Sequence, residues 1–253
     1  MDYLVYAYLQ QAKDANAREV LAEMDAISKL DENQFAAAYA FAAAPARLAL
    51  ERHDWKAAAS LEIKPAWFPW SRFRNAEALV HYARAIGAAR SGDLVAARRS
   101  AEQIAAIRGA TLATRDYSWS RSIGAQWEAV DGLIAWAEGN KVKGLRLLRI
   151  AAEHEDGVDK PPVTPGAVLP VREMLADLLL ESGSASEALR EYEAVLKIAP
   201  RRFNATAGAA KAADKAGDRI KARAYAIELR EIANNAVTSR PELEWARVYL
   251  AGK

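Results

Sequence analysis

The chain has no cysteine, and this absence excludes several kinds of chemistry. It can form no disulfide framework, no thiolate nucleophile and no cysteine metal site. The three histidines, His53, His81 and His154, are far apart and none belongs to an HExxH spacing, so we expect no metal and no other cofactor. These absences limit the catalytic and metal-binding chemistry open to the protein, but they do not indicate its cellular compartment.

Long apolar runs are missing as well. No stretch approaches the roughly 18 to 20 apolar residues of a membrane span, and the N-terminal MDYLVYAYLQQAKD lacks the basic region and cleavage site of a signal peptide. A formal charge of +2 is too small to predict a nucleic-acid partner or a membrane surface. We expect a soluble protein, cytoplasmic by default and exported or periplasmic if a longer parent carries a leader.

Strand patterns are almost absent, whereas helical ones fill the chain. Alanine dominates, and valine, isoleucine and threonine never alternate with polar residues over the length of a strand. Hydrophobic residues make up 52% of the 253 residues, enough for a continuous core. The sequence therefore predicts an all-α protein.

A short turn residue followed five positions later by a small residue recurs along the chain. Gly183 with Ala188 and Gly217 with Ala222 lie 34 residues apart, which is the tetratricopeptide (TPR) period. The earlier pairs are more widely spaced: Ala12 and Ala17, His53 and Ala58, Gly92 and Ala97, Gly139 and Gly144. Glycine accepts the left-handed geometry at a helix end, and the small residue lets the second helix pack closely on the first.

The sequence thus predicts a single domain, residues 1–253, that is a right-handed α-solenoid of about six TPR-like hairpins. Proline at position 200 ends the best repeat, and the tail RPELEWARVYLAGK reads as a terminal capping helix. The expected hairpins span about 2–28, 33–63, 74–108, 117–154, 168–199 and 203–234, and the capping helix spans 241–251.

The stretch VTPGAVLPVREMLADLLLESGSASEALREYEAVLKIAP and its continuation resemble a family of uncharacterised bacterial TPR proteins. The likeness extends back through FPWSRFRNAEALVHYARAIGAARSGD to DYLVYAYLQ. It implies that the chain corresponds to the C-terminal half of longer members, which often carry an export leader. The first helix has no cap before it, which also suggests a piece of something longer. Where the family tends to have histidine before PVTPG, this chain has Pro161.

Three insertions interrupt the repeat: the aromatic and basic KPAWFPWSRFRN (64–75), the polar link RGATLATRDYSWS (108–120) and the proline-rich EDGVDKPPVTPGAVLP (155–170). Proline and glycine prevent the third from being helical throughout. Loops of this length inside a compact array are often functional. A further proline, Pro45, is expected to begin a helix at ARLALER.

The first helices of the hairpins would line the inner face of a TPR superhelix, where such proteins commonly hold peptides. Glu173 and Asp177 share a face on one such helix, and two like charges there favour a cation across from them. The alternatives are a solvated helix face and packing against the next hairpin. The same register places these residues on the inner surface: Tyr6, Arg47, Tyr82, Gln126, Asn204 and Lys211.

The segment AWFPWSRFR is the most distinctive local feature. It interleaves Trp67, Phe68, Trp70 and Phe73 with Arg72 and Arg74, and arginine beside aromatic rings favours recognition of carboxylates. An acidic peptide is therefore one expected ligand. The competing interpretation is that the rings fill the gap between two hairpins.

We expect no enzyme. GNKVKG lacks the phosphate-binding pattern, no GxSxG elbow is present, and only a hydrolase-like site assembled from distant segments stays open. The first hypothesis is a non-catalytic interaction module or scaffold that binds a peptide or partner protein, including the N-terminal half of a longer parent. The alternative is a small-ligand-binding or enzyme accessory protein whose pocket is closed by the 155–170 loop.

Overall fold

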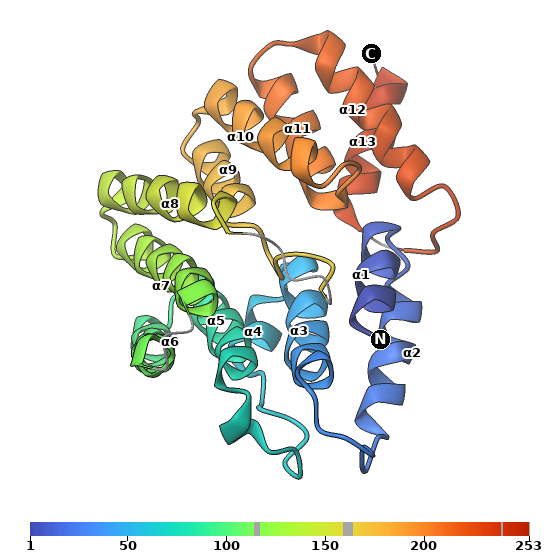
Figure 1. The fold of residues 1–253 in the computed structure, drawn as a ribbon. Helices are drawn as coiled ribbons and strands as arrows, with labels where there is room; N and C mark the ends of the chain where they lie inside the picture. The colour runs from blue at the N-terminus through green and yellow to red at the C-terminus, as the bar shows by residue number, and fades with distance from the viewer. Residues whose placement is uncertain (114–116, 159–163, 239, 253) are drawn as a thin grey trace. The chain divides into compact units, whose positions relative to one another are not determined.

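The structure is a computed structural model that describes residues 1–113, 117–158, 164–238 and 240–252. Within these ranges the chain forms thirteen α-helices and one short 3-10 helix, with no β-strand (Figure 1). The all-α prediction is confirmed.

The first twelve helices follow one another in pairs, and each pair is joined by two or three residues. The pairs are α1 (Asp2–Gln10) and α2 (Asp14–Asp25), α3 (Phe35–Glu51) and α4 (Trp55–Ala59), α5 (Arg74–Ser91) and α6 (Leu94–Ala113), α7 (Tyr117–Ala137) and α8 (Lys141–Asp156), α9 (Val171–Glu181) and α10 (Ala185–Ile198), and α11 (Phe203–Lys215) and α12 (Arg219–Ile232). The 3-10 helix η1 (Trp70–Arg72) precedes α5, and α13 (Pro241–Gly252) follows the last pair.

The turn inside every pair has the same backbone geometry. One residue takes a positive φ, between 52° and 89°, and the N–H of the next residue donates to the carbonyl five positions earlier at 2.9 Å. This is the Schellman ending of a helix, which satisfies carbonyls that the helix leaves open. The left-handed residues are those that the sequence marks as turns: Ala12, His53, Gly92, Gly139, Gly183 and Gly217.

The residue after the left-handed one often caps the second helix. The side chains of Asp54, Asp93, Asn140 and Asp218 each accept the backbone N–H three positions on, at 2.9 to 3.2 Å. Short polar side chains suit this position because they satisfy one of the four open N–H groups of a helix start. One five-residue stretch therefore ends one helix and starts the next.

Small residues make close helix packing between successive pairs possible. A Cβ added to Gly208 of α11 would lie 2.3 Å from the ring of Tyr192 on α10, and one added to Gly87 of α5 would lie 2.4 Å from the backbone nitrogen of Ala59. Neither neighbour leaves room for a methyl group. The predicted small residues are buried throughout: Ala17, Ala58, Ala97, Gly144, Ala188 and Ala222.

The chain divides into two compact units. Unit 1 comprises Met1–Val5 and Arg18–Val171, and unit 2 comprises Tyr6–Ala17 and Arg172–Lys253. In unit 1, first helices of successive pairs pack on one another, α3 on α5 and α5 on α7, and α5 also packs on α4 and α7 on α6. In unit 2, α10 packs on α11, α11 on α12 and α12 on α13.

Two local expectations were wrong. The polar link at 108–120 is not a loop where the structure describes it, because α6 continues to Ala113 and α7 begins at Tyr117. Gly109, directly after Arg108, stands where a helix-ending glycine is common, but it takes no positive φ and α6 continues through it into ATLA, which has no further glycine or proline. Pro45 does not begin a helix but lies inside α3, which starts ten residues earlier in an alanine-rich run whose helix propensity outweighs one proline.

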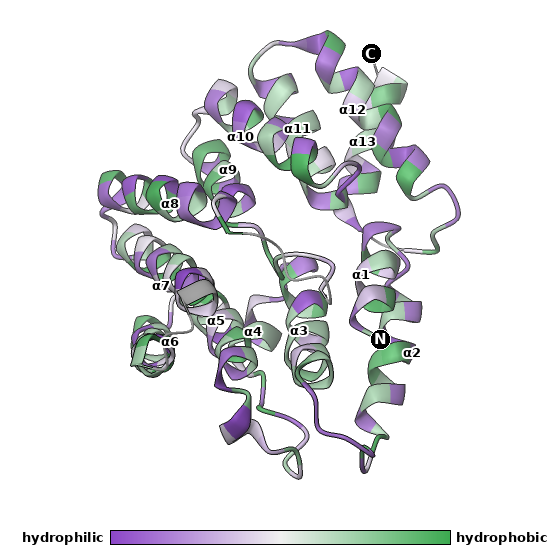
Figure 2. Ribbon diagram, viewed as in Figure 1, coloured by the Kyte–Doolittle hydropathy of each residue, from purple (hydrophilic) through white to green (hydrophobic). Residues whose placement is uncertain are grey.

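Each helix mixes hydrophobic and hydrophilic residues along its length, as Figure 2 shows. None of the described helices is both long and apolar enough to cross a membrane. The core is built largely of alanine, with larger buried side chains such as Leu50, Ile104 and Phe203 between the helices. Alanine permits short distances between helix axes, which fits the crowding at the glycines.

Candidate functional site

Arg47 on α3 lies at the centre of a buried polar cluster in unit 1. Its side chain is fully buried, and its Nε and Nη2 donate to the two carboxylate oxygens of Asp2 on α1, at 2.8 and 3.3 Å. The same guanidinium donates from Nη2 to the carbonyl of Gly166 at 2.6 Å and from Nη1 to that of Ala167 at 2.7 Å. One arginine thus joins two helices to the end of the proline-rich insertion.

Two tyrosines bind the same stretch of backbone. The hydroxyl of Tyr3 donates to the carbonyl of Thr164 at 2.7 Å, and that of Tyr39 donates to the carbonyl of Gly166 at 3.4 Å. We call Tyr3, Tyr39 and Arg47 the carbonyl-binding cluster. Four of its hydrogen bonds go to main-chain oxygens of residues 164–167, and such bonds specify an extended backbone more than a particular side chain.

Residues 164–169, here called the inserted segment, are also anchored by apolar side chains. Val168 and Leu169 are each only 1% exposed, and Gly166 has a φ of 122°, which glycine adopts without strain. Beyond the segment, the Glu155 carboxylate accepts the backbone N–H of Val171 at 2.8 Å. The segment is therefore held by hydrogen bonds along its backbone and by two buried side chains near its end.

Burial dominates the electrostatics of this cluster. It raises the pKa of Asp2, an effect that the neighbouring Arg47 opposes, and it raises the pKa of Tyr39, so that hydroxyl stays protonated as a donor. Burial also raises the pKa of Tyr82 on α5 well above 10, and the Glu155 carboxylate adds to the shift. The Tyr82 hydroxyl is buried and has no hydrogen-bond partner in the described part of the chain.

The aromatic segment is mostly part of the core. Phe68 is 3% exposed and lies against the rings of Phe41, Trp67, Trp70 and Phe73, with centroids 5.2 to 5.9 Å away. Trp70 is buried, and its indole N–H donates to the carbonyl of Pro65 at 3.0 Å. These rings stabilise the region between α4 and α5. This agrees with the competing interpretation of the segment, in which the rings fill a gap between two hairpins.

Three predicted residues of that segment face outward. Trp67 is 41% exposed, and Arg72 is exposed with its guanidinium 5.8 Å from the centre of the Phe73 ring. Arg74 is exposed and forms an ion pair of 3.3 Å with Glu77 one turn along α5. They offer a small aromatic and cationic surface; that it binds a ligand stays a prediction.

In unit 2, Glu173 is paired with a cation, Arg202, as the sequence predicted. Arg202 donates to its two carboxylate oxygens at 2.6 and 3.0 Å, and both side chains are buried. Asp177, one turn along α9, is half-buried and accepts the hydroxyl of Tyr192 at 2.5 Å. The remaining predicted residues are half-buried: Tyr6, Gln126, Asn204 and Lys211.

The predicted residues therefore do not form one site. Arg47 belongs to the carbonyl-binding cluster and Glu173 to a separate buried ion pair. Tyr82, on α5, is buried. Pro161, which the sequence analysis singled out, lies outside the described residues. Among the described residues, no group of three or more His, Cys, Asp or Glu is placed to hold a metal ion.

The partner residues in three buried ion pairs were not predicted from the sequence. Asp2 pairs with Arg47, Arg202 pairs with Glu173, and Arg240 pairs with Asp14, the two Nε distances of that last pair being 3.2 Å. A signal was present, because Arg202 and Arg240 each stand immediately before a helix, where a short capping side chain is usual. An arginine at that position is better explained by a buried acidic partner.

Known proteins do not identify the chain. No family model matches it, and no curated protein or solved structure is significantly similar to it.

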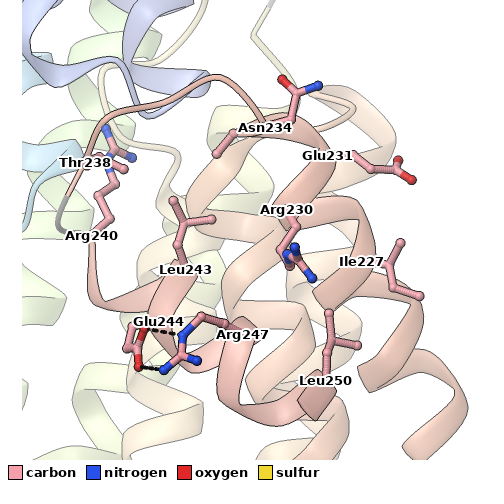
Figure 3. Close-up of a pocket in the computed structure, with 11 residues that line it drawn as sticks. Ile227, Arg230, Glu231, Asn234, Thr238, Arg240, Leu243, Glu244, Arg247 and Leu250 are labelled. Carbon is pink, nitrogen blue, oxygen red and sulfur yellow. Dashed lines mark hydrogen bonds and ion pairs between the residues drawn. The ribbon is translucent and has the colours of Figure 1, made fainter.

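A second surface lies between α12 and α13 in unit 2. It is a pocket of about 780 Å³, with Ile227, Arg230 and Glu231 from α12 and Leu243, Arg247 and Leu250 from α13 on its walls (Figure 3). Glu244 accepts two hydrogen bonds from Arg247, at 2.8 and 2.6 Å. Helix α13 thus leaves a hollow with charged and apolar walls beside α12, on which it packs.

Proposed function

We propose that this chain is a TPR-like α-solenoid that acts as a non-catalytic interaction module, binding an extended peptide or a segment of a partner protein on the face formed by its first helices. The repeated Schellman turn, the small residue five positions later, and the packing of α3 on α5 and α5 on α7 support the architecture.

The observation that carries the binding function is the carbonyl-binding cluster. Tyr3, Tyr39 and Arg47 make four hydrogen bonds to three main-chain carbonyls of the inserted segment. A face that holds one extended backbone by donors preorganised on helices has the chemistry to hold another. The inserted segment then serves as the resident occupant, and a partner's segment would take its place.

Binding in trans tests this proposal. Residues 158–169 would be replaced by a glycine and serine linker of equal length, which keeps α8 joined to α9 but removes Val168 and Leu169. The labelled heptapeptide TPGAVLP, residues 164–170, would be titrated by fluorescence anisotropy. We expect saturable binding and a rise in the melting temperature of the linker chain, because a ligand of the native state stabilises it.

A matched pair of variants shows where the peptide lies. Tyr3→Phe in the linker chain removes one donor to a carbonyl and should weaken binding about 2- to 10-fold, as expected for one hydrogen bond. Tyr8→Phe, also on α1, removes a hydroxyl that has no partner among the described residues and should leave binding unchanged. A folded linker chain that fails to bind TPGAVLP contradicts the proposal.

The buried hydroxyl of Tyr82 favours a second candidate, a small-ligand site closed by the proline-rich loop. An orphan hydroxyl in an apolar interior costs free energy unless something bonds to it, and the Glu155 carboxylate acts on it as well as on Tyr39. A small polar molecule could supply that bond. A thermal-shift screen would support this candidate if a hit lost its effect in Tyr82→Phe while TPGAVLP binding was retained.

A further inference from the structure

Helix α12 displays two exposed stripes side by side. Arg219, Arg223 and Arg230 are spaced by four and seven residues, so they lie along one line of the helix, and Ile220, Ala224 and Ile227 repeat the spacing of four and three beside it. Ile220 is 85% exposed and Ile227 is 42% exposed.

None of the guanidinium groups of these three arginines has a hydrogen-bond or ion-pair partner among the described residues. Elsewhere in unit 2, arginines such as Arg202 and Arg240 are buried in ion pairs. A single exposed apolar residue is ordinary on a protein surface, but here two exposed isoleucines on one helix face lie beside a line of unpaired guanidinium groups and form a patch with them.

Helix α13 forms the opposite wall. Leu243, Arg247 and Leu250 recur at four and three residues and line the 780 Å³ pocket together with Ile227. A second hollow of about 460 Å³, lined by Arg219, Ile220, Arg223, Ala224 and Ile227, continues along α12. Ile227 lines both hollows, so they adjoin one another along α12, and we call the two together the α12–α13 groove.

The lining of this groove carries more positive than negative charge. Five arginines line it, Arg219, Arg223, Arg230, Arg240 and Arg247, against two acids, Glu231 and Glu244. Arg240 is paired with Asp14 and Arg247 with Glu244, which leaves three arginines unpaired within the described part of the chain. From Ile220 to Glu231 the wall runs about 16 Å, or three turns of a helix. An occupant that matches it needs carboxylates on one side and an apolar stripe about three turns long.

We propose that the α12–α13 groove binds an acidic amphipathic helix of a partner protein. The partner's apolar side chains would pack between Ile227, Leu243 and Leu250, and its carboxylates would accept forked hydrogen bonds from Arg219, Arg223 and Arg230. Helix-in-groove binding uses this combination of a spaced apolar stripe and flanking charges, and arginine is the cation best suited to carboxylates. Glu231 and Glu244 also line the groove and would repel an anionic membrane, whereas a helix can place its carboxylates away from them.

The probe is a fluorescein-labelled 18-residue helical peptide with leucine at every third or fourth position, glutamate on the flanking positions and alanine elsewhere. We expect saturable binding to the intact chain by anisotropy, weakening as salt is raised. Two matched peptides separate the contributions, one with lysine for glutamate and one with serine for leucine. Both should bind at least about tenfold more weakly.

Substitutions place the peptide on the groove. Arg230→Glu should weaken binding about tenfold or more by putting like charges together, and Ile227→Asp should do the same by removing the shared apolar contact. Arg190→Glu is the matched control, because Arg190 is exposed on α10 with no partner among the described residues and lies outside the groove. All three changes are at exposed positions, so folding should be retained.

Three outcomes would overturn the inference: no binding of the glutamate peptide, equal weakening by Arg190→Glu and Arg230→Glu, or binding only to vesicles of phosphatidylserine. The last result would make the stripe a membrane-binding surface. TPGAVLP has no charged side chain, and the carbonyl-binding cluster lies in unit 1, so the two experiments are independent. If the glutamate peptide does not bind, the proposed function is unaffected. If TPGAVLP does not bind, the proposal for the α12–α13 groove is unaffected.

Discussion

The left-handed turns predict opposite effects of the same substitution at two glycines of unit 1. Gly139 ends α7 with a φ of 89°, whereas Gly109 lies inside helix α6. A Cβ built on either glycine meets nothing within 4 Å, so Gly139→Ala and Gly109→Ala differ only in the backbone conformation that alanine must adopt.

The magnitudes follow from the two conformations. A left-handed conformation costs an L-residue about 1–2 kcal/mol, partly offset by the smaller entropy that alanine loses on folding, so Gly139→Ala should destabilise by about 1 kcal/mol. In a helix, alanine is favoured over glycine by about 0.8–1 kcal/mol, so Gly109→Ala should stabilise by about that amount. The two variants should therefore differ by about 2 kcal/mol in the free energy of unfolding.

Urea unfolding followed by far-UV circular dichroism measures the difference. The midpoints should move in opposite directions with unchanged slopes, because neither substitution alters the surface exposed on unfolding. Thermal midpoints should move by about 2–4 °C per kcal/mol for a chain of this size. Stabilisation by Gly139→Ala, or shifts of the same sign in both variants, would refute the claim that glycine is required by the turn.

Three further predictions concern packing and charge. Gly208→Ala should destabilise by about 1–3 kcal/mol, because its methyl group overlaps a tyrosine ring and the helices must separate; a neutral urea midpoint would contradict this. Glu173→Gln should cost about 3 kcal/mol by leaving the buried charge of Arg202 without its carboxylate, and a loss below 1 kcal/mol would show that water reaches the pair. Trp70→Ala should lower the free energy of unfolding by about 3–5 kcal/mol, measured by thermal and urea unfolding. Arg72→Ala should lower it by less than about 1 kcal/mol. A larger loss for Arg72→Ala than for Trp70→Ala would show that the arginine, and not the tryptophan, stabilises the aromatic segment.

The turns could be predicted from sequence because their chemistry is local. A left-handed residue, a short capping side chain and a small residue are all within six positions of one another, as at Gly217, Asp218 and Ala222. Even Ala12 and His53, which are poor left-handed residues, were identified by the small residue that follows five positions later. The helix pairs follow from the same signals.

Interactions between distant residues could not be predicted in this way. Asp2 and Arg47 are 45 residues apart, and Arg47 reaches Gly166 across 119 more. Periodicity places Arg47 on a helix face but does not reveal that the chain's own inserted segment lies against it. The aromatic segment shows the same difficulty, because core and binding surface use the same residue types and differ only in what covers them.

Some helix ends were also hard to predict. Gly109 looks like the end of a helix although α6 continues to Ala113, and Pro45 looks like a helix start although α3 passes through it. The α12–α13 groove was missed for a different reason. The tail was correctly assigned a helix, but the hollow that it leaves depends on how Leu243 and Leu250 lie against α12.

The most direct test of the central claim is photo-cross-linking from the carbonyl-binding cluster. Replacing Tyr3 with azidophenylalanine places the reactive group where the hydroxyl now meets Thr164, at a position exposed enough to accept it. In the unaltered chain, mass spectrometry should map the cross-link to residues 164–169, and in the linker chain it should map to added TPGAVLP. A folded chain that cross-links to neither would contradict the account of this face as a binding surface for extended backbone.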